Sequence, residues 1–208
     1  MSQNRNGLLL VVSGPAGVGK GTINDALLAR HENIRMSVSA TTRAPRPGEI
    51  DGVHYFFRDE EEFEQMIARG EFLEYMRVFN MNYYGTPRKF VEDELASSRS
   101  VILEIDVEGG MNVKQAFPDA VLIFITPPSM IQLKERLIGR DTETPEQVEQ
   151  RFQTAFREVE RAREYDYIVV NHVVDMAVSR VEQIIQAERC RCSRNQAFLS
   201  ELTGGMMK

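Results

Sequence analysis

The stretch Leu8–Thr22, with the sequence LLLVVSGPAGVGKGT, decides the fold of this 208-residue chain. Its first five residues form an uninterrupted apolar run, which is typical of a strand buried on both faces of a parallel sheet. The glycines that follow let successive backbone N–H groups turn toward a single anion. The apolar residues Ile23, Ala26 and Leu27 then recur at helical spacing. Strand, glycine-rich loop and helix thus follow the order of a phosphate-binding loop, in which the helix N-terminus favours negative charge.

The lysine of this loop supplies the positive charge that such a site needs. We expect Lys20 to reach the β- and γ-phosphates of a nucleoside triphosphate. The usual pattern has Ser or Thr directly after the lysine, but here Gly21 takes that place and the hydroxyl follows at Thr22. We therefore expect Mg²⁺ to be held mainly by phosphates and water, since this ion gives up its water reluctantly. The residues predicted to bind the triphosphate are Gly14, Pro15, Ala16, Gly17, Val18, Gly19, Lys20, Gly21 and Thr22.

The remaining apolar runs predict an α/β fold. Residues 101–105, 121–125 and 167–170 are further candidate buried strands. Helical spacing follows Ser129, and residues 144–147, TPEQ, form a capping box with proline at the first helical position. A last helix carries apolar residues at 178, 181, 184 and 185. Strands that alternate with helices indicate a parallel sheet, which we assign to a three-layer α/β/α fold of the P-loop NTPase type.

Residues 36–87 follow a different pattern. Short alternating segments at 36–40 and 54–57 predict strands, and a helix capped by Asp59 is expected to end at Gly70. We interpret this region as a small α+β lobe inserted into the sheet domain. The tail at residues 202–208 is expected to fray.

The composition limits the classes of function. The net charge of −6 disfavours nucleic acid and membrane partners, and the apolar run at 8–12 is too short for a membrane span or a signal peptide. Cys190 and Cys192 suit a reducing cytoplasm as ordinary thiols on a helix. Neither His31 nor His54 has a partner at catalytic spacing, so both are expected at the surface or in the lobe.

A second candidate phosphate site lies at residues 41–49, TTRAPRPGE. Arg43 and Arg46 are three residues apart, beside prolines that reduce the entropy cost of holding one backbone shape. Such a segment can present both guanidinium groups to one phosphate, and the alternative is a solvated basic turn.

The segments around these two sites resemble the guanylate kinase family. The resemblance rests on the phosphate loop, residues 41–49, EFLE at 71–74, NYYGT at 82–86 and IDVEG at 105–109, in the family's order. It extends from about residue 8 to about residue 190. It implies a single domain with a core at 7–35, 88–126 and 166–195, a GMP-binding lobe at 36–87 and a helical lid at 127–165.

The resemblance also implies the substrates and the residues that bind them. ATP would phosphorylate GMP, with dGMP as a further acceptor, in purine nucleotide metabolism and GMP recycling, and Mg²⁺ would accompany ATP. Asn171 is implied near the adenine. The residues implied for GMP are Arg43, Arg46, Tyr55 and Tyr84 at the phosphate, Ser39, Glu74, Thr86 and Asp106 around the guanine, and Glu49 beside them.

Glu74 suits guanine on chemical grounds. Guanine presents two adjacent donors, N1–H and the exocyclic amine, and one carboxylate can accept both. Adenine has no donor at N1, so it would leave the carboxylate desolvated and unpaired, at a cost on the order of several kcal/mol. Asp106, alone or with Glu104, is expected either near Mg²⁺ or on the guanine side, and the sequence leaves both open.

The resemblance places the start of the lid at residues 136–143, RLIGRDTE. Arg136, Arg140 and Arg151 would approach the ATP phosphates and act with Lys20 and Arg43 as catalytic residues that neutralise charge. The chain departs from the family's usual residues at five positions, namely Met81, Glu104, Asp141, His172 and Val173.

The expected reaction is direct in-line phosphoryl transfer, without a covalent intermediate or a general base, because the acceptor oxygen is already anionic. Closure of lobe and lid, with hinges near residues 36, 87, 127 and 165, would exclude water. The rival readings are a kinase acting on AMP or a phosphorylated ribose, a non-catalytic phosphopeptide-binding module, and a GTPase or general ATPase. The sequence is compatible with a monomer or a homo-oligomer.

Overall fold

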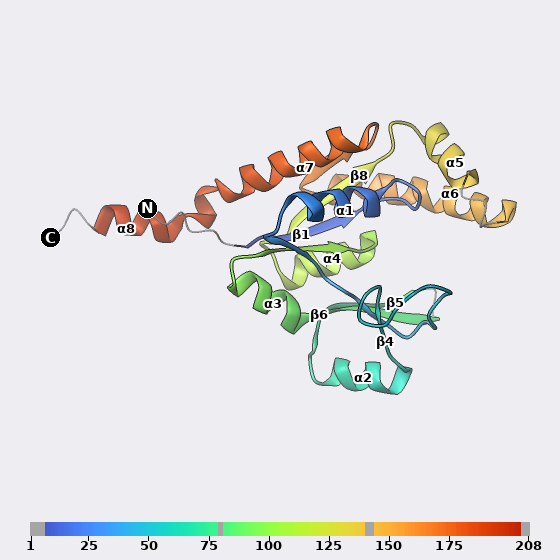
Figure 1. Cartoon of the computed structure of the whole chain (residues 1–208), viewed down its shortest axis with the longest axis horizontal. Coiled ribbons are helices and arrows are strands. Elements are labelled where there is room, and N and C mark those ends of the chain that lie inside the picture. The colour runs from blue at the N-terminus through green and yellow to red at the C-terminus, as the bar shows by residue number, and fades with distance from the viewer. Residues whose placement is uncertain (1–6, 79–80, 140–143, 205–208) are drawn as a thin grey trace.

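The computed structural model (Figure 1) describes residues 7–78, 81–139 and 144–204. Its larger sheet is parallel throughout. The strand order is β2-β7-β1-β8-β9. At the centre, Leu10 lies opposite Ile102 on one side and Val121 on the other. The strands are β1 (Leu9–Ser13), β2 (Ile34–Met36), β7 (Ser100–Glu104), β8 (Val121–Thr126) and β9 (Tyr167–Val170). The central strand therefore delivers the glycine-rich loop to the carboxyl edge of the sheet, where α/β proteins bind ligands.

Helices cover both faces of this sheet, which confirms the predicted three layers. Leu10 and Val12 of β1 face one helical layer, while Leu9 and Val11 face the other, so both faces are apolar. The first layer contains α1 (Lys20–Arg30), α5 (Met130–Ile138), α6 (Pro145–Glu160) and α7 (Val174–Arg189). The second contains α3 (Arg88–Ala96), α4 (Val107–Ala116) and the short 3₁₀ helix η1 (Arg161–Glu164).

The glycine-rich loop needs its glycines for close packing. Gly14 and Gly19 have φ angles of 145° and 95°. A Cβ atom would lie 2.2 Å from the Ile125 carbonyl oxygen if added at Gly14, and 2.6 Å from Asn171 Nδ2 if added at Gly19. The loop can therefore turn tightly over the ends of β8 and β9 only because these side chains are absent.

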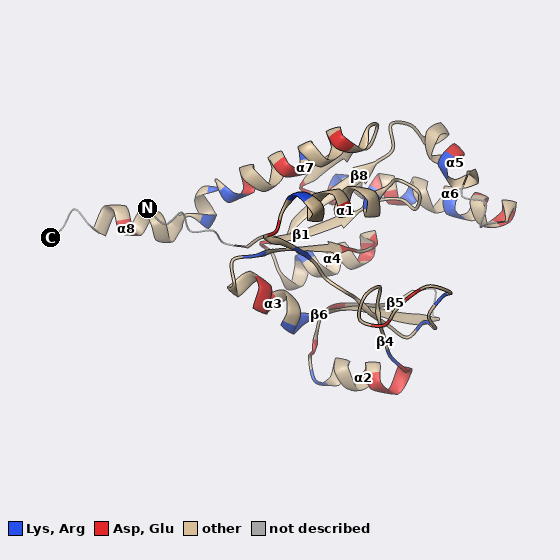
Figure 2. Cartoon of the chain, viewed as in Figure 1, with Lys and Arg blue, Asp and Glu red and all other residues tan. Residues whose placement is uncertain are grey.

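A second sheet, with the order β4-β3-β6-β5, forms the small lobe. Phe63 of its helix stacks on Phe72 and Tyr83, at centroid distances of 4.4 and 5.1 Å. Asp59 caps that helix as predicted, and its acidic first turn (Figure 2) suits the positive end of the helix dipole. The elements are β3 (Ala40–Thr41), β4 (Phe56–Phe57), α2 (Glu60–Ala68), β5 (Phe72–Val78) and β6 (Asn82–Pro87).

The predicted strands of the large sheet are confirmed to within one residue, but the prediction for residues 36–40 is wrong. Met36 ends β2 in the large sheet, and Ala40 begins β3 in the lobe. The Ser37 N–H still bonds to the Ile102 carbonyl, so the chain leaves the large sheet within the predicted strand. The hairpin of β5 and β6 was not anticipated as strands.

Helices α5 and α6, in the segment predicted to form the lid, begin at capped residues. The Ser129 side chain accepts from the Gln132 N–H, and Thr144 and Gln147 form the complete capping box. In the described part of the chain, no helix combines the length and the apolar character that crossing a bilayer requires.

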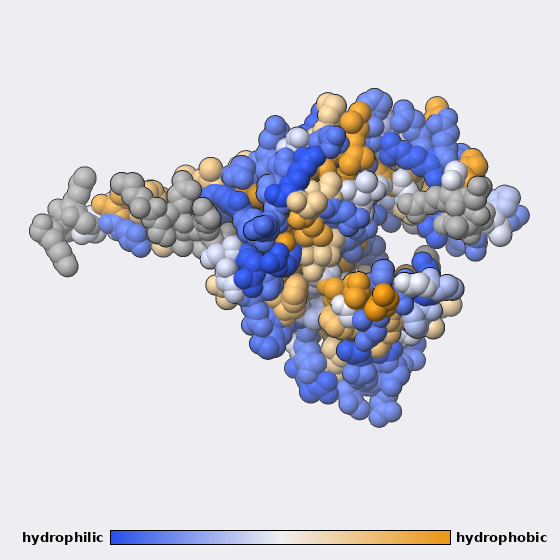
Figure 3. All heavy atoms as spheres, in the orientation of Figure 1, coloured by the Kyte–Doolittle hydropathy of each residue, from blue (hydrophilic) through white to orange (hydrophobic). Residues whose placement is uncertain are grey.

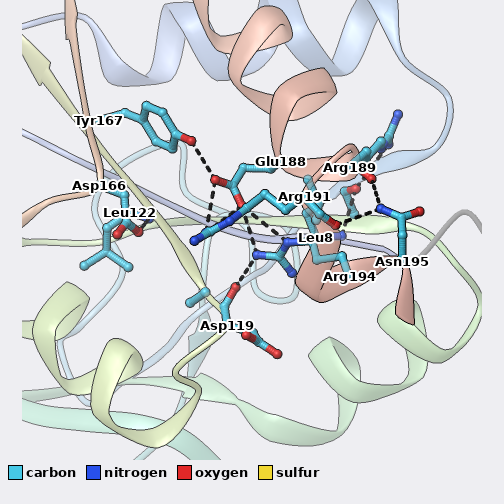
Figure 4. A network of polar contacts seen from close by, with 12 residues as sticks. Leu8, Asp119, Leu122, Asp166, Tyr167, Glu188, Arg189, Arg191, Arg194 and Asn195 are labelled. Carbon is cyan, nitrogen blue, oxygen red and sulfur yellow. Dashed lines mark hydrogen bonds and ion pairs between the residues drawn. The ribbon is translucent and has the colours of Figure 1, made fainter. Parts of the chain in front are cut away.

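The C-terminal segment is held to the sheet by a buried carboxylate (Figure 4). Glu188, 1% exposed at the end of α7, accepts from the Tyr167 hydroxyl at 2.6 Å and pairs with Arg191 and Arg194. Arg194 also donates to the Asp119 carbonyl at 2.7 Å. Beyond this network, η2 (Cys192–Arg194) leads to α8 (Gln196–Gly204), which extends away from the body in Figure 1.

Two expectations for the C-terminal end of the chain are corrected. Cys190 and Cys192 are exposed, but only Cys192 lies on a helix, the short 3₁₀ helix η2, whereas Cys190 is the C-cap of α7. Residues 202–204 were expected to fray and instead belong to α8, while 205–208 lie outside the described residues. Elsewhere in the chain, His54 is an exposed lobe residue as expected, and the partly exposed His31 lies 2.9 Å from a Glu182 carboxylate oxygen.

Candidate functional site

Lys20 opens α1 and lies over the glycine-rich loop. Its ammonium group donates to the carbonyl oxygens of Gly14 at 2.6 Å and Pro15 at 3.2 Å. Gly19 precedes the helix in the left-handed conformation, and the first turn contains no acidic residue. The ammonium group and the positive end of the helix dipole therefore serve the same small region, which suits a polyphosphate.

A cleft of about 360 Å³ opens between this loop and the small lobe, and Figure 3 shows the molecule hollowed between them. The cleft is lined by residues from both predicted sites: Gly14, Ala16 and Lys20 from the core, Ser39, Tyr55, Glu74 and Tyr84 from the lobe, and Glu104 and Asp106 at the end of β7 and just beyond it. The segments that the sequence assigned to two different nucleotides thus face a single cavity.

Glu74 lies on β5 with only 8% of its surface exposed. The hydroxyl of Thr86, its neighbour across the hairpin, donates to Glu74 Oε1 at 2.8 Å. Burial, assisted by the negative charge of Asp106, raises the pKa of Glu74 to about 7. A base that offers two donors to this carboxylate would favour its ionised form.

Asp106 lies beside Glu74 and caps α4. Its Oδ1 accepts from the Gly109 N–H at 2.7 Å. A Cβ atom at Gly109 would lie 3.2 Å from that oxygen and 3.5 Å from Glu74 Oε2, so this glycine makes room for both carboxylates. Water reaches Asp106, but surrounding protein still raises its pKa, while Lys20 opposes the rise. Asp106 thus lies near both Glu74, which is assigned to guanine, and Lys20, which is assigned to the phosphates. Its position therefore does not choose between the guanine side and the Mg²⁺ side.

Glu49 orders the arginine segment. Its carboxylate pairs with the Arg43 guanidinium at 2.9 Å and accepts from the Arg46 backbone N–H at 2.7 Å. These two bonds, that of Arg43 above all, lower the pKa of Glu49 to about 2. One carboxylate therefore fixes the side chain of Arg43 and the main chain at Arg46. Arg46 itself is exposed.

Two tyrosines complete this side of the cleft. The guanidinium carbon of Arg43 lies 5.4 Å from the centroid of the Tyr55 ring, and Tyr84 meets Tyr55 edge-on at 6.0 Å. Burial raises the pKa of Tyr55, so its hydroxyl remains a donor at neutral pH. Arg43, Tyr55 and Tyr84 thus form one cluster of donors, as a phosphate site requires.

Helix α5 is attached to the glycine-rich loop through Arg136. Arg136 donates to the carbonyl oxygens of Val18 at 3.4 Å and Asn171 at 3.1 Å. The buried Asn171 amide also donates to the Val18 carbonyl, at 2.8 Å. Arg151 is exposed on α6, and Arg140 lies outside the described residues. The roles of these arginines at ATP, and of Asn171 at adenine, stay predictions.

Comparison with known proteins now identifies the family. The family model described as guanylate kinase matches residues 6–188. A guanylate kinase of Clostridium perfringens strain SM101 is 51% identical over 199 residues, which cover 96% of this chain and 92% of that protein. The chain belongs to the guanylate kinase family. A second guanylate kinase, from Caldanaerobacter subterraneus subsp. tengcongensis, is 48% identical over 94% of this chain and 95% of its own length.

A solved guanylate kinase shares the fold. The crystal structure of guanylate kinase from Anaplasma phagocytophilum matches with a TM-score of 0.75 at 36% identity, and the match covers 94% of each chain. Because the chain belongs to this family, it is an enzyme that transfers a phosphoryl group from ATP to GMP, and the prediction of a guanylate kinase is confirmed. The readings as an AMP kinase, a scaffold or a general ATPase lose their support.

Guanylate kinases, as nucleotide kinases, generally act on Mg–ATP, and the oxygen ligands present here fit that ion. Glu104, at the end of β7, accepts from the Asn24 amide at 2.8 Å. A Cβ atom at Gly21 would lie 3.9 Å from Glu104 Oε2, so this carboxylate borders the place that a loop hydroxyl usually takes. No group of three or more ligand-type side chains in the described part of the chain could hold an ion by itself. That Mg²⁺ is held mainly by phosphates and water stays a prediction.

Some residues that line the cleft of this guanylate kinase were missed from the sequence. Met76 and Val78 alternate with Glu74 along β5, so the period of two would have shown them had the strand been recognised. Glu158 of α6 also lines the cleft. Its signal was the seven-residue spacing from Arg151, which places both on one face of a helix.

Proposed function

We propose that this guanylate kinase transfers the γ-phosphoryl group of ATP directly to the phosphate of GMP or dGMP. The observation that supports this most strongly is the shared cleft, with Lys20 on one wall and Glu74, held by Thr86, on the other. Residues are assigned to the phosphate and to the base of the acceptor but none to its sugar, so the proposal includes dGMP.

The acceptor is bound at both ends. Glu74 accepts the N1–H and amine donors of guanine, and ionises as it does so. Arg43, Tyr55 and Tyr84 donate to the phosphate, with Arg46 as a further donor. Because Glu49 already holds Arg43 at 2.9 Å, little side-chain freedom is lost when GMP binds.

Transfer itself depends on charge and position. The GMP phosphate oxygen is anionic and attacks the γ-phosphorus in line, so no residue needs to remove a proton. Lys20 neutralises charge on the transferring group, and Arg136, Arg140 and Arg151 assist as the lid closes and excludes water. Mg²⁺ bound with ATP would spread the negative charge of the phosphates, with Asp106 or Glu104 beside its water.

The wider setting follows from the same chemistry. We place the enzyme in purine nucleotide metabolism, where it would recycle GMP to GDP in the cytoplasm, a compartment that suits its two free thiols. The net charge of −6 speaks against nucleic acid or membrane partners. Monomer and homo-oligomer both remain compatible with this proposal.

A coupled assay of ADP release tests the substrate assignment. With Mg–ATP as donor, GMP and dGMP should turn over, while AMP, UMP and CMP should be poor acceptors. A clear preference for AMP in folded protein would contradict the guanine assignment. The in-line step is tested with ATP made chiral at the γ-phosphorus: inversion is expected from a single displacement, and retention would require a covalent intermediate.

A substitution separates the two nucleotides. Glu74→Gln should raise KM for GMP by about 100-fold or more, since it places an amide donor against a guanine donor, and should leave KM for ATP within about threefold. The matched control is Glu71→Gln, which removes an exposed carboxylate three residues away. Equal losses for both nucleotides would remove Glu74 from its assigned role.

A further inference from the structure

Glu158 is a half-buried carboxylate on the lid helix α6 that the mechanism above leaves without a task. It lines the same cleft as Lys20 and Asp106. Among the described residues, its carboxylate accepts no hydrogen bond and forms no ion pair. Burial raises its pKa, while Lys20 opposes that rise and Asp106 adds to it. Since an unpaired, half-buried carboxylate costs free energy, we expect Glu158 to gain a partner when the site closes.

The charges that line the cleft indicate which kind of ligand the Glu158 carboxylate would meet. The lining contains one lysine, Lys20, and the four carboxylates Glu74, Glu104, Asp106 and Glu158. ATP and GMP are both polyanions, and repulsion between like charges grows as a closing site expels water. A divalent cation that arrives with ATP reverses this balance for the carboxylates nearest to it.

We propose that Glu158 is a positioning residue that holds the water shell of ATP-bound Mg²⁺ as the lid closes, so that tight binding of ATP depends on the metal. The inference rests on the proposed function, because it concerns the ATP side of the cleft. Mg²⁺ usually keeps several of its waters, and a carboxylate beside those waters acts through hydrogen bonds rather than direct ligation. This agrees with the described side chains, which provide no direct cluster of three ligands.

The position of Glu158 distinguishes it from the other carboxylates of the site. Glu104 and Asp106 lie at the fixed carboxyl edge of the sheet, whereas Glu158 lies on a lid helix. Arg151 lies seven residues earlier on α6, hence on the same helical face. The closing helix thus presents an arginine to the phosphates and a carboxylate to the hydrated metal that neutralises them.

Titration of a fluorescent ATP analogue tests the proposal, with excess Mg²⁺ and separately with EDTA, in the absence of GMP. Glu158→Gln should weaken binding with Mg²⁺ by about tenfold, the lower end of the effect of losing an outer-shell partner. The same variant should bind the metal-free analogue a few-fold more tightly, because a negative charge is gone. Glu160→Gln, an equal charge change at an exposed site on α6, should alter neither value.

The role of Glu158 is identified by the opposite effects of Glu158→Gln on binding of the Mg²⁺-bound and the metal-free analogue. A purely structural effect of Glu158→Gln would weaken both forms of the analogue, and that result would overturn the proposal, as would an unchanged dependence on Mg²⁺. Because GMP is absent, the outcome does not depend on whether GMP is the acceptor. Unchanged thermal unfolding of both variants would show that the protein is intact.

Discussion

At the scale of single residues, Glu74 carries the largest conflict between stability and function. Its carboxylate is buried beside that of Asp106, and the Thr86 hydroxyl is the hydrogen-bond donor to it. Such a group is costly to ionise in the free protein, yet it must be ionised to accept both donors of guanine. GMP binding therefore provides the stabilisation that the folded protein lacks.

The pKa of about 7 predicts how GMP binding responds to pH. Below pH 7 the carboxyl gains a proton and can no longer accept both guanine donors, so KM for GMP should rise about tenfold from pH 8 to pH 6. Steady-state kinetics over this range would measure it. In Glu74→Gln the rise attributable to this residue should vanish, and an equal rise in both proteins would assign it to another group, such as the GMP phosphate.

The raised pKa of Glu74 also predicts that Glu74→Gln makes the folded protein more stable at pH 8, although the variant loses activity. The folded pKa of Glu74 lies above the unfolded value, so its relative stabilisation is complete below pH 4.5 and is lost as pH rises through 7. At pH 8 the ionised group costs roughly 3 kcal/mol, and Glu74→Gln should recover a large part of that. Urea unfolding at pH 8 and pH 5 would measure the difference, which should shrink at pH 5. A variant that is less stable at both values would contradict this account.

At the scale of elements, α4 and the segment between η1 and β9 meet at one glycine. A Cβ atom at Gly110 would lie 2.6 Å from the Tyr165 hydroxyl oxygen and 3.3 Å from Ser13 Oγ. Tyr165 is buried, and burial raises its pKa to about 12. Close packing here connects the start of α4, which carries Asp106 as its cap, with the residues that lead from η1 into β9.

This packing predicts a rescue. Gly110→Ala should lower stability by about 1–3 kcal/mol through overpacking, although alanine favours the helix. Tyr165→Phe removes the obstructing hydroxyl, so the double variant should recover most of the loss. A double-mutant cycle from urea unfolding would measure the coupling. Additive effects of the two substitutions would show that the hydroxyl is not the obstacle.

The elements also show what the sequence could predict. Long apolar runs, such as those of β1 and β8, and helices with explicit caps, such as Asp59 and Thr144, carry a local signal, and the structure reproduces them. The three-residue β2 and the β5–β6 hairpin carry little. Whether Met36 pairs with β7 or with the lobe depends on contacts far along the chain.

At the scale of the molecule, the motifs predicted which residues gather at the cleft better than how they act. Lys20, Tyr55 and Glu74 line one cavity, as the family resemblance implied. The pairing of Arg43 with Glu49 and the attachment of Arg136 to backbone carbonyls depend on tertiary packing, which spacing does not encode. Glu158 was missed although its seven-residue spacing from Arg151 places both on one helical face, because spacing alone does not show that this face meets the cleft.

Two nucleotides share one cleft in the proposed reaction, so a dinucleotide in which guanosine and adenosine are joined by five phosphates would occupy both sites at once. Calorimetric titration should show that it binds about 100-fold or more tightly than ATP or GMP alone, because the second contact becomes intramolecular. The diadenosine analogue should lose most of this gain, and so should the Glu74→Gln variant with the mixed dinucleotide. Affinity no higher than that of ATP alone would contradict the account, since it would mean that the loop of Lys20 and the pocket of Glu74 do not act together.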